Sequence, residues 1–374
     1  MTFADLQAGA LPRPEETLTT CAENVRNAYA KIFQVQERTS REPELRHTRV
    51  VGYMLINLDR FRHILEDSPV EYAADQINRH IYTPSGPTID SVVFELGRRY
   101  EGLLMAFRNR KQMIDPSMHP SRPSFDDEVD MHLGIVDGSR RDNRTVKKEA
   151  LVRDGFRCVA TSVLDHSYVK AYKQLRNEPP LGAIDTECCH IIAVANFTEC
   201  AHAHSQDDRK LQATNLTAIL SSFGIKIYEK LLNEDGFGDI CNILTLRSDV
   251  HKFFDRLETW FEPTQNAHEY KIYHAYEWTQ PALHTHDTVT FKIHDSFFEK
   301  SASFTATMKS KPDDYLPNPK SLALHAACAR VAHMSGAAQV MDKWNLDLED
   351  KSVLASDGSD MDLFIYAMSK LVSR

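Results

Sequence analysis

The sequence has no long apolar run, and no stretch approaches the roughly 18 to 20 residues that a membrane-spanning helix needs. Its first residues, MTFADLQAGALPRPEE, have neither the basic segment nor the apolar segment of a secretory signal. We therefore expect no membrane association and an intracellular protein, cytoplasmic or nuclear.

Two further absences narrow the class of protein. The seven cysteines are an odd number and form no CxxC pair, which argues against a disulfide framework and favours reduced thiols. There is also no excess of positive charge, since the net charge is −9. This argues against a protein that coats nucleic acid without specificity, although it leaves room for a local basic surface.

The composition is that of an ordinary globular protein, with 42% hydrophobic and 26% charged residues and no visible internal repeat. We predict an α+β fold in three segments. Residues 1–125 are mostly helical and end in a Pro-rich linker, 113–125. Residues 126–297 contain β-rich runs and an insertion at about 196–240. Residues 298–374 are again helical.

Apolar residues at three-to-four spacing predict the helices, because such residues share one helix face. We expect these faces to pack against one another. Three stripes lie in the N-terminal region and a fourth spans 318–343. Their members are Leu18, Cys21, Val25, Tyr29 and Ile32; Val51, Leu55, Leu58, Phe61 and Leu65; Val93, Leu96, Tyr100, Leu103 and Phe107; and Leu324, Cys328, Val331, Met334, Ala338 and Met341.

The middle of the chain has a different pattern of residues. Short β-rich runs appear as FRCVATSV, AIDTECCHIIAV, EYKIYHAY and TVTFKIHDSFF. Just before them, residues 139–157 hold the strongest basic cluster, within which a helix is predicted at about 143–154. Such a cluster is either a solvated helix face or a surface for phosphates. Its basic residues are Arg140, Arg141, Arg144, Lys147, Lys148, Arg153 and Arg157.

A pair of potential metal ligands follows in the segment CNILTLRSDVHKFFD. His251 and Asp255 are four residues apart, so on a helix they project from the same face. An imidazole and a carboxylate there suit zinc, manganese or magnesium, but a surface ion pair gives the same spacing. We expect Phe253 and Phe254 to pack this helix onto strands.

Two other residues complete the pattern, and each also has a plain structural interpretation. His190, in the apolar run CCHIIAV, fits a core histidine on a strand as well as a catalytic base. Asn242, between EDGFGD and ILTL, fits a turn residue that bonds its own backbone.

Taken together, the spacing N-x8-H-x3-D with an upstream Cys-His-Ile resembles the HNH endonucleases of the His-Me finger (ββα-metal) superfamily. The phrases RDGFRC, CHIIAVANF and NILTLRSDVHKFFD carry the resemblance over about 145–265. The phrases DYLPNPKSLALHAACARV and SGAAQVMDKW are similar to segments of fungal members. The resemblance implies a ββα-metal core interrupted by the insertion and flanked by the helical regions.

The resemblance implies a role for each residue. His190 would be the general base and Asn242 would orient it or hold its loop, while His251 and Asp255 would bind one divalent metal. Cys189 stands where the superfamily usually has a metal-binding Asp or His. A thiolate ligates zinc well and magnesium poorly. Alternation along a strand also points Cys189 and His190 to opposite faces unless the strand bulges or ends there.

The implied activity is hydrolysis of phosphodiester bonds by a metal-dependent endonuclease. Its partner would be nucleic acid, with DNA favoured over RNA, contacted by Arg140, Arg141, Arg144, Lys147, Lys148 and Arg157. Protein partners are not indicated. The alternatives are a non-catalytic HNH module that binds nucleic acid or a protein, and a helical interaction protein with a decayed nuclease core. A separate zinc site at Cys188, Cys189, Cys200, His202 and His204 matches no common spacing.

Overall fold

The structure, a computed structural model, describes residues 6–66, 68–79, 86–108, 149–171, 182–192, 240–294 and 315–350. Several expectations from the sequence fall outside this part of the chain. They are the linker at 113–125, nearly all of the insertion at 196–240, the terminal helix expected at 359–372, and Arg140, Arg141, Arg144, Lys147 and Lys148.

The chain forms two compact units, and the mixed α+β class expected from the sequence is confirmed. Among the described residues, the first unit contains 149–192 and 240–322, and the second contains 6–108 and 323–350. The helices after residue 323 thus share a unit with the N-terminal helices. The three-segment division of the sequence stays a prediction.

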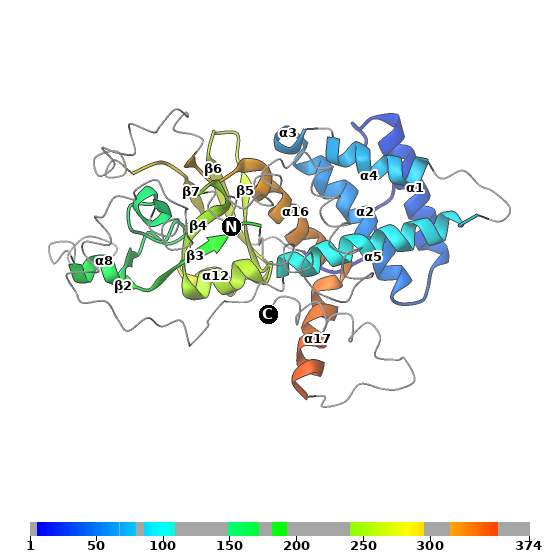
Figure 1. The fold of residues 1–374 in the computed structure, drawn as a ribbon. Helices are drawn as coiled ribbons and strands as arrows, with labels where there is room; N and C mark the ends of the chain where they lie inside the picture. The colour runs from blue at the N-terminus through cyan, green and yellow to red at the C-terminus, as the bar shows by residue number, and fades with distance from the viewer. Residues whose placement is uncertain are drawn as a thin grey trace, which may run out of the picture. The chain divides into compact units, whose positions relative to one another are not determined.

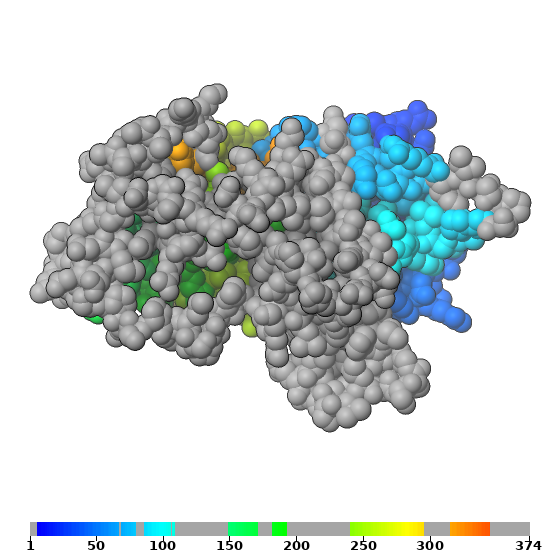
Figure 2. Space-filling view, viewed as in Figure 1, coloured from blue at the N-terminus to red at the C-terminus, as the bar shows by residue number. Residues whose placement is uncertain are grey.

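The second unit is helical (Figure 1). The apolar stripes predicted in the N-terminal region are buried throughout, each below 8% exposure, so these helices do pack by those faces. Parts of α4 and α5 lie on the face shown in Figure 2, in light blue and cyan. The helices are α1 (Glu23–Arg38), α2 (Glu44–Arg60), α3 (Arg62–Leu65), α4 (Ser68–Asn78), α5 (Ile89–Arg108), α16 (Pro319–Ser335), which enters this unit at 323, and α17 (Ala337–Asp350).

A buried charged network joins α2 to α5. Arg46 Nε donates to Glu101 Oε1 at 2.6 Å, and His47 Nε2 lies 2.9 Å from Glu101 Oε2. Burial alone would raise the pKa of the Glu101 carboxyl, but the bonds from His47 and Arg46 lower it below its ordinary value. The two helices approach closely at Gly97, where a Cβ would lie 2.3 Å from the backbone oxygen of His47.

The stripe predicted over 318–343 is divided between two helices rather than carried by one. α16 ends at Ser335 and α17 begins at Ala337. Gly336 lies between them at φ +86°, a left-handed conformation that side chains disfavour. A glycine in that conformation ends the first helix, as it does at many helix C-termini.

The first unit contains three small sheets. The pairs are β1 with β2, parallel, β3 with β4, antiparallel, and β5 with β6 and β7, antiparallel. Short helices lie between β1 and β2, between β4 and β5, and between β6 and β7. The elements are β1 (Leu164–Asp165), α8 (His166–Ala171), β2 (Ala183–Ile184), β3 (Thr186–His190), the 3-10 turn η4 (Ile240–Asn242), β4 (Ile243–Arg247), α12 (Ser248–Asp255), β5 (Thr259–Pro263), β6 (Glu269–His274), α13 (Thr279–Leu283) and β7 (Thr288–Thr290).

The β-rich runs have mixed outcomes. AIDTECCH, EYKIYH and TVT form strands, whereas FRCVATSV does not. That run turns instead, because Phe156 and Ser162 adopt positive φ and the Ser162 N–H bonds the Cys158 carbonyl at 2.8 Å. Among the described residues, this run pairs with a strand through an isolated bridge from Arg157 to Leu164 alone.

The sequence predicts no membrane-spanning helix. In the described ranges, no helix combines the length and the apolar character needed to cross a bilayer.

Candidate metal centre

The first strand of the centre, β3, is fixed at its start by Asp165. One carboxylate oxygen accepts from the main-chain N–H of Thr186 at 3.2 Å and from its hydroxyl at 2.6 Å. The other accepts from the N–H groups of Ser167 and Tyr168 at the start of α8. A single buried carboxylate therefore anchors both the strand and the neighbouring helix.

The second strand, β4, is held by the short helix whose described residues are 149–153. The Arg153 side chain is fully buried and donates to the carbonyls of Ile240 and Ile243 at 2.8 Å and of Tyr315 at 3.1 Å. Asp154 pairs with Arg153 and accepts from the Thr245 N–H at 3.2 Å. Arg153 is thus committed to main-chain carbonyls and takes no part in a basic surface.

The helix α12 follows β4 directly. The joint is braced by Arg247, which makes a bidentate contact to Asp249 at 2.6 Å and donates to the Leu283 carbonyl at 2.9 Å. Asp249 lies in the first turn of α12, where a negative charge interacts favourably with the helix dipole. Inside, Val250 and Phe254 are fully buried, as expected for the face that packs on strands. α12 contacts both β3 and β4.

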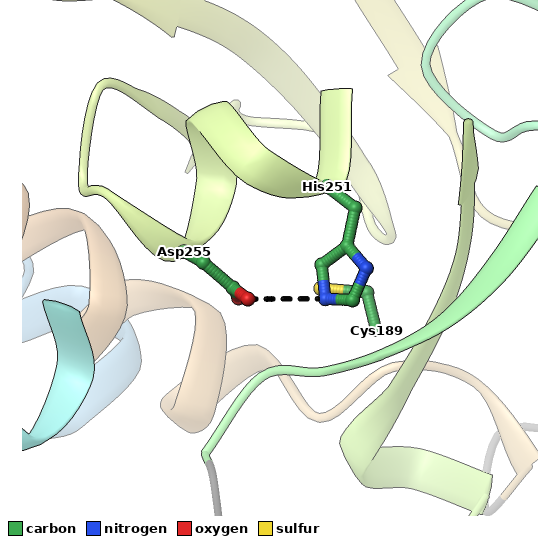
Figure 3. A group of neighbouring side chains, drawn as sticks. All are labelled: Cys189, His251 and Asp255. Atoms are coloured by element: carbon green, nitrogen blue, oxygen red, sulfur yellow. Dashed lines mark ion pairs between the residues drawn. The ribbon is translucent and has the colours of Figure 1, made fainter. Parts of the chain in front are cut away.

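Three side chains from this arrangement converge. Ligand atoms of Cys189 on β3 and of His251 and Asp255 on α12 all lie within 4.8 Å of one another (Figure 3). His251 Nε2 lies 3.2 Å from Asp255 Oδ2. The helical spacing predicted from the sequence is confirmed for the last two residues. A thiolate, an imidazole and a carboxylate at these distances can hold a metal ion.

Glu187 completes the surroundings of His251. Its Oε2 lies 2.6 Å from His251 Nδ1, so the two ring nitrogens face two different carboxylates. Burial by itself lowers the pKa of His251, but Cys189, Asp255 and Glu187 together raise the pKa far above its ordinary value. With Nδ1 held by Glu187, Nε2 is the nitrogen directed at Asp255.

Sequence reasoning missed Glu187, although a signal for it was present. Glu187 and Cys189 are two apart on a strand, and residues two apart lie on the same face. Any helix covering Cys189 must therefore also meet Glu187. A carboxylate that orients a ligand histidine through its other nitrogen is a common feature of metal sites.

His190 has a different position. Pairing between β3 and β4 is regular from Thr186–Arg247 to His190–Ile243, with no bulge. Since Glu187 and Cys189 face α12, alternation places Cys188 and His190 on the other face. Cys188 accordingly packs against Ala150, Ile240 and Ile243. His190 is the last residue of its strand, and its role as a base stays a prediction.

Asn242 holds the chain just beyond His190. Its Oδ1 accepts from the Ile192 N–H at 2.9 Å and its Nδ2 donates to the Ile192 carbonyl at 2.8 Å. Its own carbonyl accepts from the Ile191 N–H at 2.8 Å. These contacts join the segment after β3 to the start of β4, which is the loop-holding function predicted as one option for this residue.

Of the six residues predicted to contact nucleic acid, Arg157 alone lies in the described part of the chain. It is half-buried and donates through Nη1 to the Ser162 carbonyl at 3.0 Å. Of the rival zinc site, Cys200, His202 and His204 lie outside the described residues. Cys188 is not a member of the described cluster.

Comparison with protein-family models, with curated proteins and with solved structures found no match for this chain.

Proposed function

We propose that this protein is a metal-dependent endonuclease of the His-Me finger type, which hydrolyses phosphodiester bonds of nucleic acid. The observation that carries the proposal is the convergence of Cys189 with His251 and Asp255, which are about sixty residues further along the chain. The supporting arrangement is two antiparallel strands followed by a helix that contacts both. This is the order of elements that the sequence resemblance implies.

The donor set indicates which metal would fit. Sulfur, nitrogen and oxygen donors together suit zinc, and a thiolate disfavours magnesium. We therefore propose zinc, with manganese next and magnesium last. A bound metal of this kind supplies positive charge against the scissile phosphate and the leaving oxygen. Cys189, His251 and Asp255 would hold it, and Glu187 would direct His251 Nε2 toward it.

His190 is the proposed base that takes the proton from the attacking water, since imidazole has the right basicity near neutral pH. In this role the ring must turn around the end of β3 to reach the centre. Asn242 would serve that geometry by fixing the main chain at Ile191 and Ile192, directly after the strand.

The test is cleavage of plasmid DNA and of RNA by purified full-length protein, first stripped of metal and then supplied with zinc, manganese or magnesium. We expect cutting that depends on metal and falls about 100-fold or more in His190→Ala, the usual range for loss of a general base. His63→Ala, at an exposed histidine of α3, is the matched control and should cut normally. Absence of His190-dependent cutting with all three metals contradicts the proposal.

A specific observation favours a second candidate, a non-catalytic module with a structural metal. Cys189 is fully buried, and the side chains of His251 and Asp255 are only 13% and 9% exposed. Side chains this buried would leave a bound metal little access to a phosphate, which suits a structural metal better than a catalytic one. This candidate predicts stoichiometric zinc and nucleic-acid binding without turnover. The binding would weaken on charge reversal of Arg140, Arg141 and Arg144.

A further inference from the structure

An exposed aromatic cluster lies beside α12. Trp278 is 57% exposed, and its ring is stacked on Tyr276 with centroids 5.8 Å apart and an interplanar angle of 7°. Phe253 of α12 meets Trp278 edge-on at 5.7 Å. The sequence predicts that Phe253 and Phe254 both pack α12 onto strands; Phe254 is fully buried and meets Phe261 of β5, whereas Phe253 is half-buried and meets Trp278. Among the described residues, Trp278 and Ile184 are the exposed large hydrophobic side chains.

Two cations border this cluster. Lys252 in the last turn of α12 and Arg256, the residue at its C-cap, are exposed and four residues apart, so they are neighbours at this end of the helix. Arg256 is also three residues from Phe253, which makes these two side chains neighbours. Within the described part of the chain, neither Lys252 nor Arg256 forms an ion pair. Their charges are available to an anionic partner.

The order of these residues around α12 relates the cluster to the metal centre. Successive helical residues are about 100° apart. His251 and Asp255 therefore occupy one flank, Lys252 and Arg256 form the outer ridge, and Phe253 occupies the opposite flank. A chain of phosphates that crosses the ridge from the metal flank reaches the cations first and the aromatic rings next.

We propose that Lys252, Arg256, Phe253, Tyr276 and Trp278 form a binding surface for single-stranded nucleic acid, with unpaired bases stacked on Trp278 and phosphates against the two cations. This proposal rests on the proposed function, because it names the substrate class of the same centre. A base inside a duplex has both faces covered by its neighbours, so an exposed ring accepts only an unpaired base. Stacking on aromatic side chains with cationic contacts to the backbone is how single strands are held without sequence preference.

One acidic residue lowers the positive charge of this surface. Glu277 is exposed between Tyr276 and Trp278 in the sequence. A carboxylate there repels phosphates, so Glu277→Gln is expected to strengthen binding of a single strand. An apolar protein partner that covered Trp278 would not respond in this way. The variant therefore distinguishes nucleic acid from an apolar occupant.

The experiment measures binding of an oligothymidylate to metal-free full-length protein, through tryptophan fluorescence. Trp260 is fully buried and Trp344 is 9% exposed, so quenching on binding reports chiefly on Trp278. We expect quenching by the single strand and little by a duplex of equal length. Because Trp278→Ala removes the reporting ring, its binding is measured by the fluorescence anisotropy of a labelled oligonucleotide. We expect this variant to bind about tenfold more weakly, while Trp278→Tyr retains most of the affinity. Ile184→Ala is the matched control for loss of an exposed apolar side chain and should leave binding unchanged.

The contribution of Lys252 and Arg256 is measured by the salt dependence of binding. Lys252→Ala with Arg256→Ala should reduce the slope of log affinity against log salt by about 1.4, since each phosphate contact on a single strand contributes about 0.7. Arg79→Ala, at an exposed arginine of the helical unit, should leave the slope unchanged. An unchanged slope in the double variant, or equal affinity of Trp278→Ala and wild type, overturns the proposal.

These outcomes separate the two proposals. His251→Ala is expected to abolish cleavage and to leave binding of the oligothymidylate intact, because the binding is measured without metal. If wild type cuts nucleic acid but Trp278→Ala binds and cuts single strands normally, the surface is wrong while the nuclease stands. If oligothymidylate binds through Trp278 and nothing is cut, the surface stands and the nuclease fails.

Discussion

The side-chain amide of Asn242 makes two hydrogen bonds to the main chain of Ile192: Oδ1 accepts from the N–H at 2.9 Å and Nδ2 donates to the carbonyl at 2.8 Å. Asn242 is buried, at 1% exposure. The side-chain amide thus bonds an N–H and a carbonyl as the main chain of a neighbouring strand would, and it extends the β3–β4 pairing beyond His190. The segment that carries His190 and the strand that leads into α12 are thereby joined at one residue.

Replacing this amide should be costly. In Asn242→Ala the N–H and the carbonyl of Ile192 lose their partner in a buried setting, at about 1–3 kcal/mol each. We expect a loss of about 2–4 kcal/mol in the free energy of unfolding of this unit, measured by urea denaturation. Asn266→Ala, at an exposed turn asparagine, is the matched control and should change stability by less than about 0.5 kcal/mol. Equal stability of the two variants would contradict the role assigned to Asn242.

Glu187 should govern metal affinity without itself being a ligand. Removing a carboxylate that orients a ligand histidine typically costs about 10- to 100-fold in affinity. We expect Glu187→Ala to bind zinc that much more weakly, in competition titrations with a chromogenic chelator. Glu187→Gln, which keeps an acceptor for Nδ1–H, should fall in between. Zinc affinity in Glu187→Ala equal to that of wild type would show that His251 needs no such support.

The two parts of the site were accessible to sequence reasoning to different degrees. The pairing of His251 with Asp255 follows from helical spacing, which is local. The proximity of Cys189 depends on antiparallel pairing between segments about fifty residues apart, so it required the family resemblance. Glu187 follows only once β3 is known to face α12. The contact of Phe253 with Trp278 depends on where the segment before α13 lies against α12, which no local pattern encodes.

The fold shows the same division. Long amphipathic helices were predictable because their apolar stripes repeat over many residues. The run FRCVATSV misled because β-branched residues fill a turn there, held by the bond from Ser162 to Cys158. The break at Gly336 is explained by one left-handed residue that an apolar stripe does not reveal.

The packing of α2 on α5 gives a prediction for the helical unit. A Cβ at residue 97 would lie 2.3 Å from the His47 carbonyl oxygen, a backbone atom that cannot move alone. Gly97→Ala should therefore destabilise this unit by about 1–3 kcal/mol. Gly102→Ala, in the same helix with open space around its Cβ, should instead stabilise by about 1 kcal/mol. Circular dichroism during thermal unfolding compares them, and a loss of stability in Gly102→Ala similar to that in Gly97→Ala would refute the assignment.

His274 gives a prediction about pH. The ring is fully buried between the hydroxyls of Thr259 and Thr285, at 2.9 Å and 2.8 Å, and burial lowers the pKa of His274 to about 4. A folded pKa below the ordinary value of about 6.5 stabilises the fold above pH 6.5. That stabilisation is lost as pH falls from 6.5 toward 4, at up to about 1.4 kcal/mol per pH unit.

Urea unfolding at several pH values, followed by tryptophan fluorescence, measures this loss. His274→Gln has no ionisable ring and should show a flatter dependence on pH over the same window. His286→Gln, at an exposed histidine nearby in the sequence, should keep the dependence of wild type. A pH dependence that is identical in His274→Gln and wild type would contradict the account.

The most direct test of the metal centre is the absorption spectrum of the cobalt(II)-substituted protein. We expect a thiolate-to-cobalt charge-transfer band in wild type and in Cys188→Ser, whose side chain lies on the other face of β3. Cys189→Ser should lack the band and bind cobalt more weakly. A band that persists in Cys189→Ser, or that is absent from wild type loaded with one equivalent of cobalt, would contradict a metal held by Cys189, His251 and Asp255.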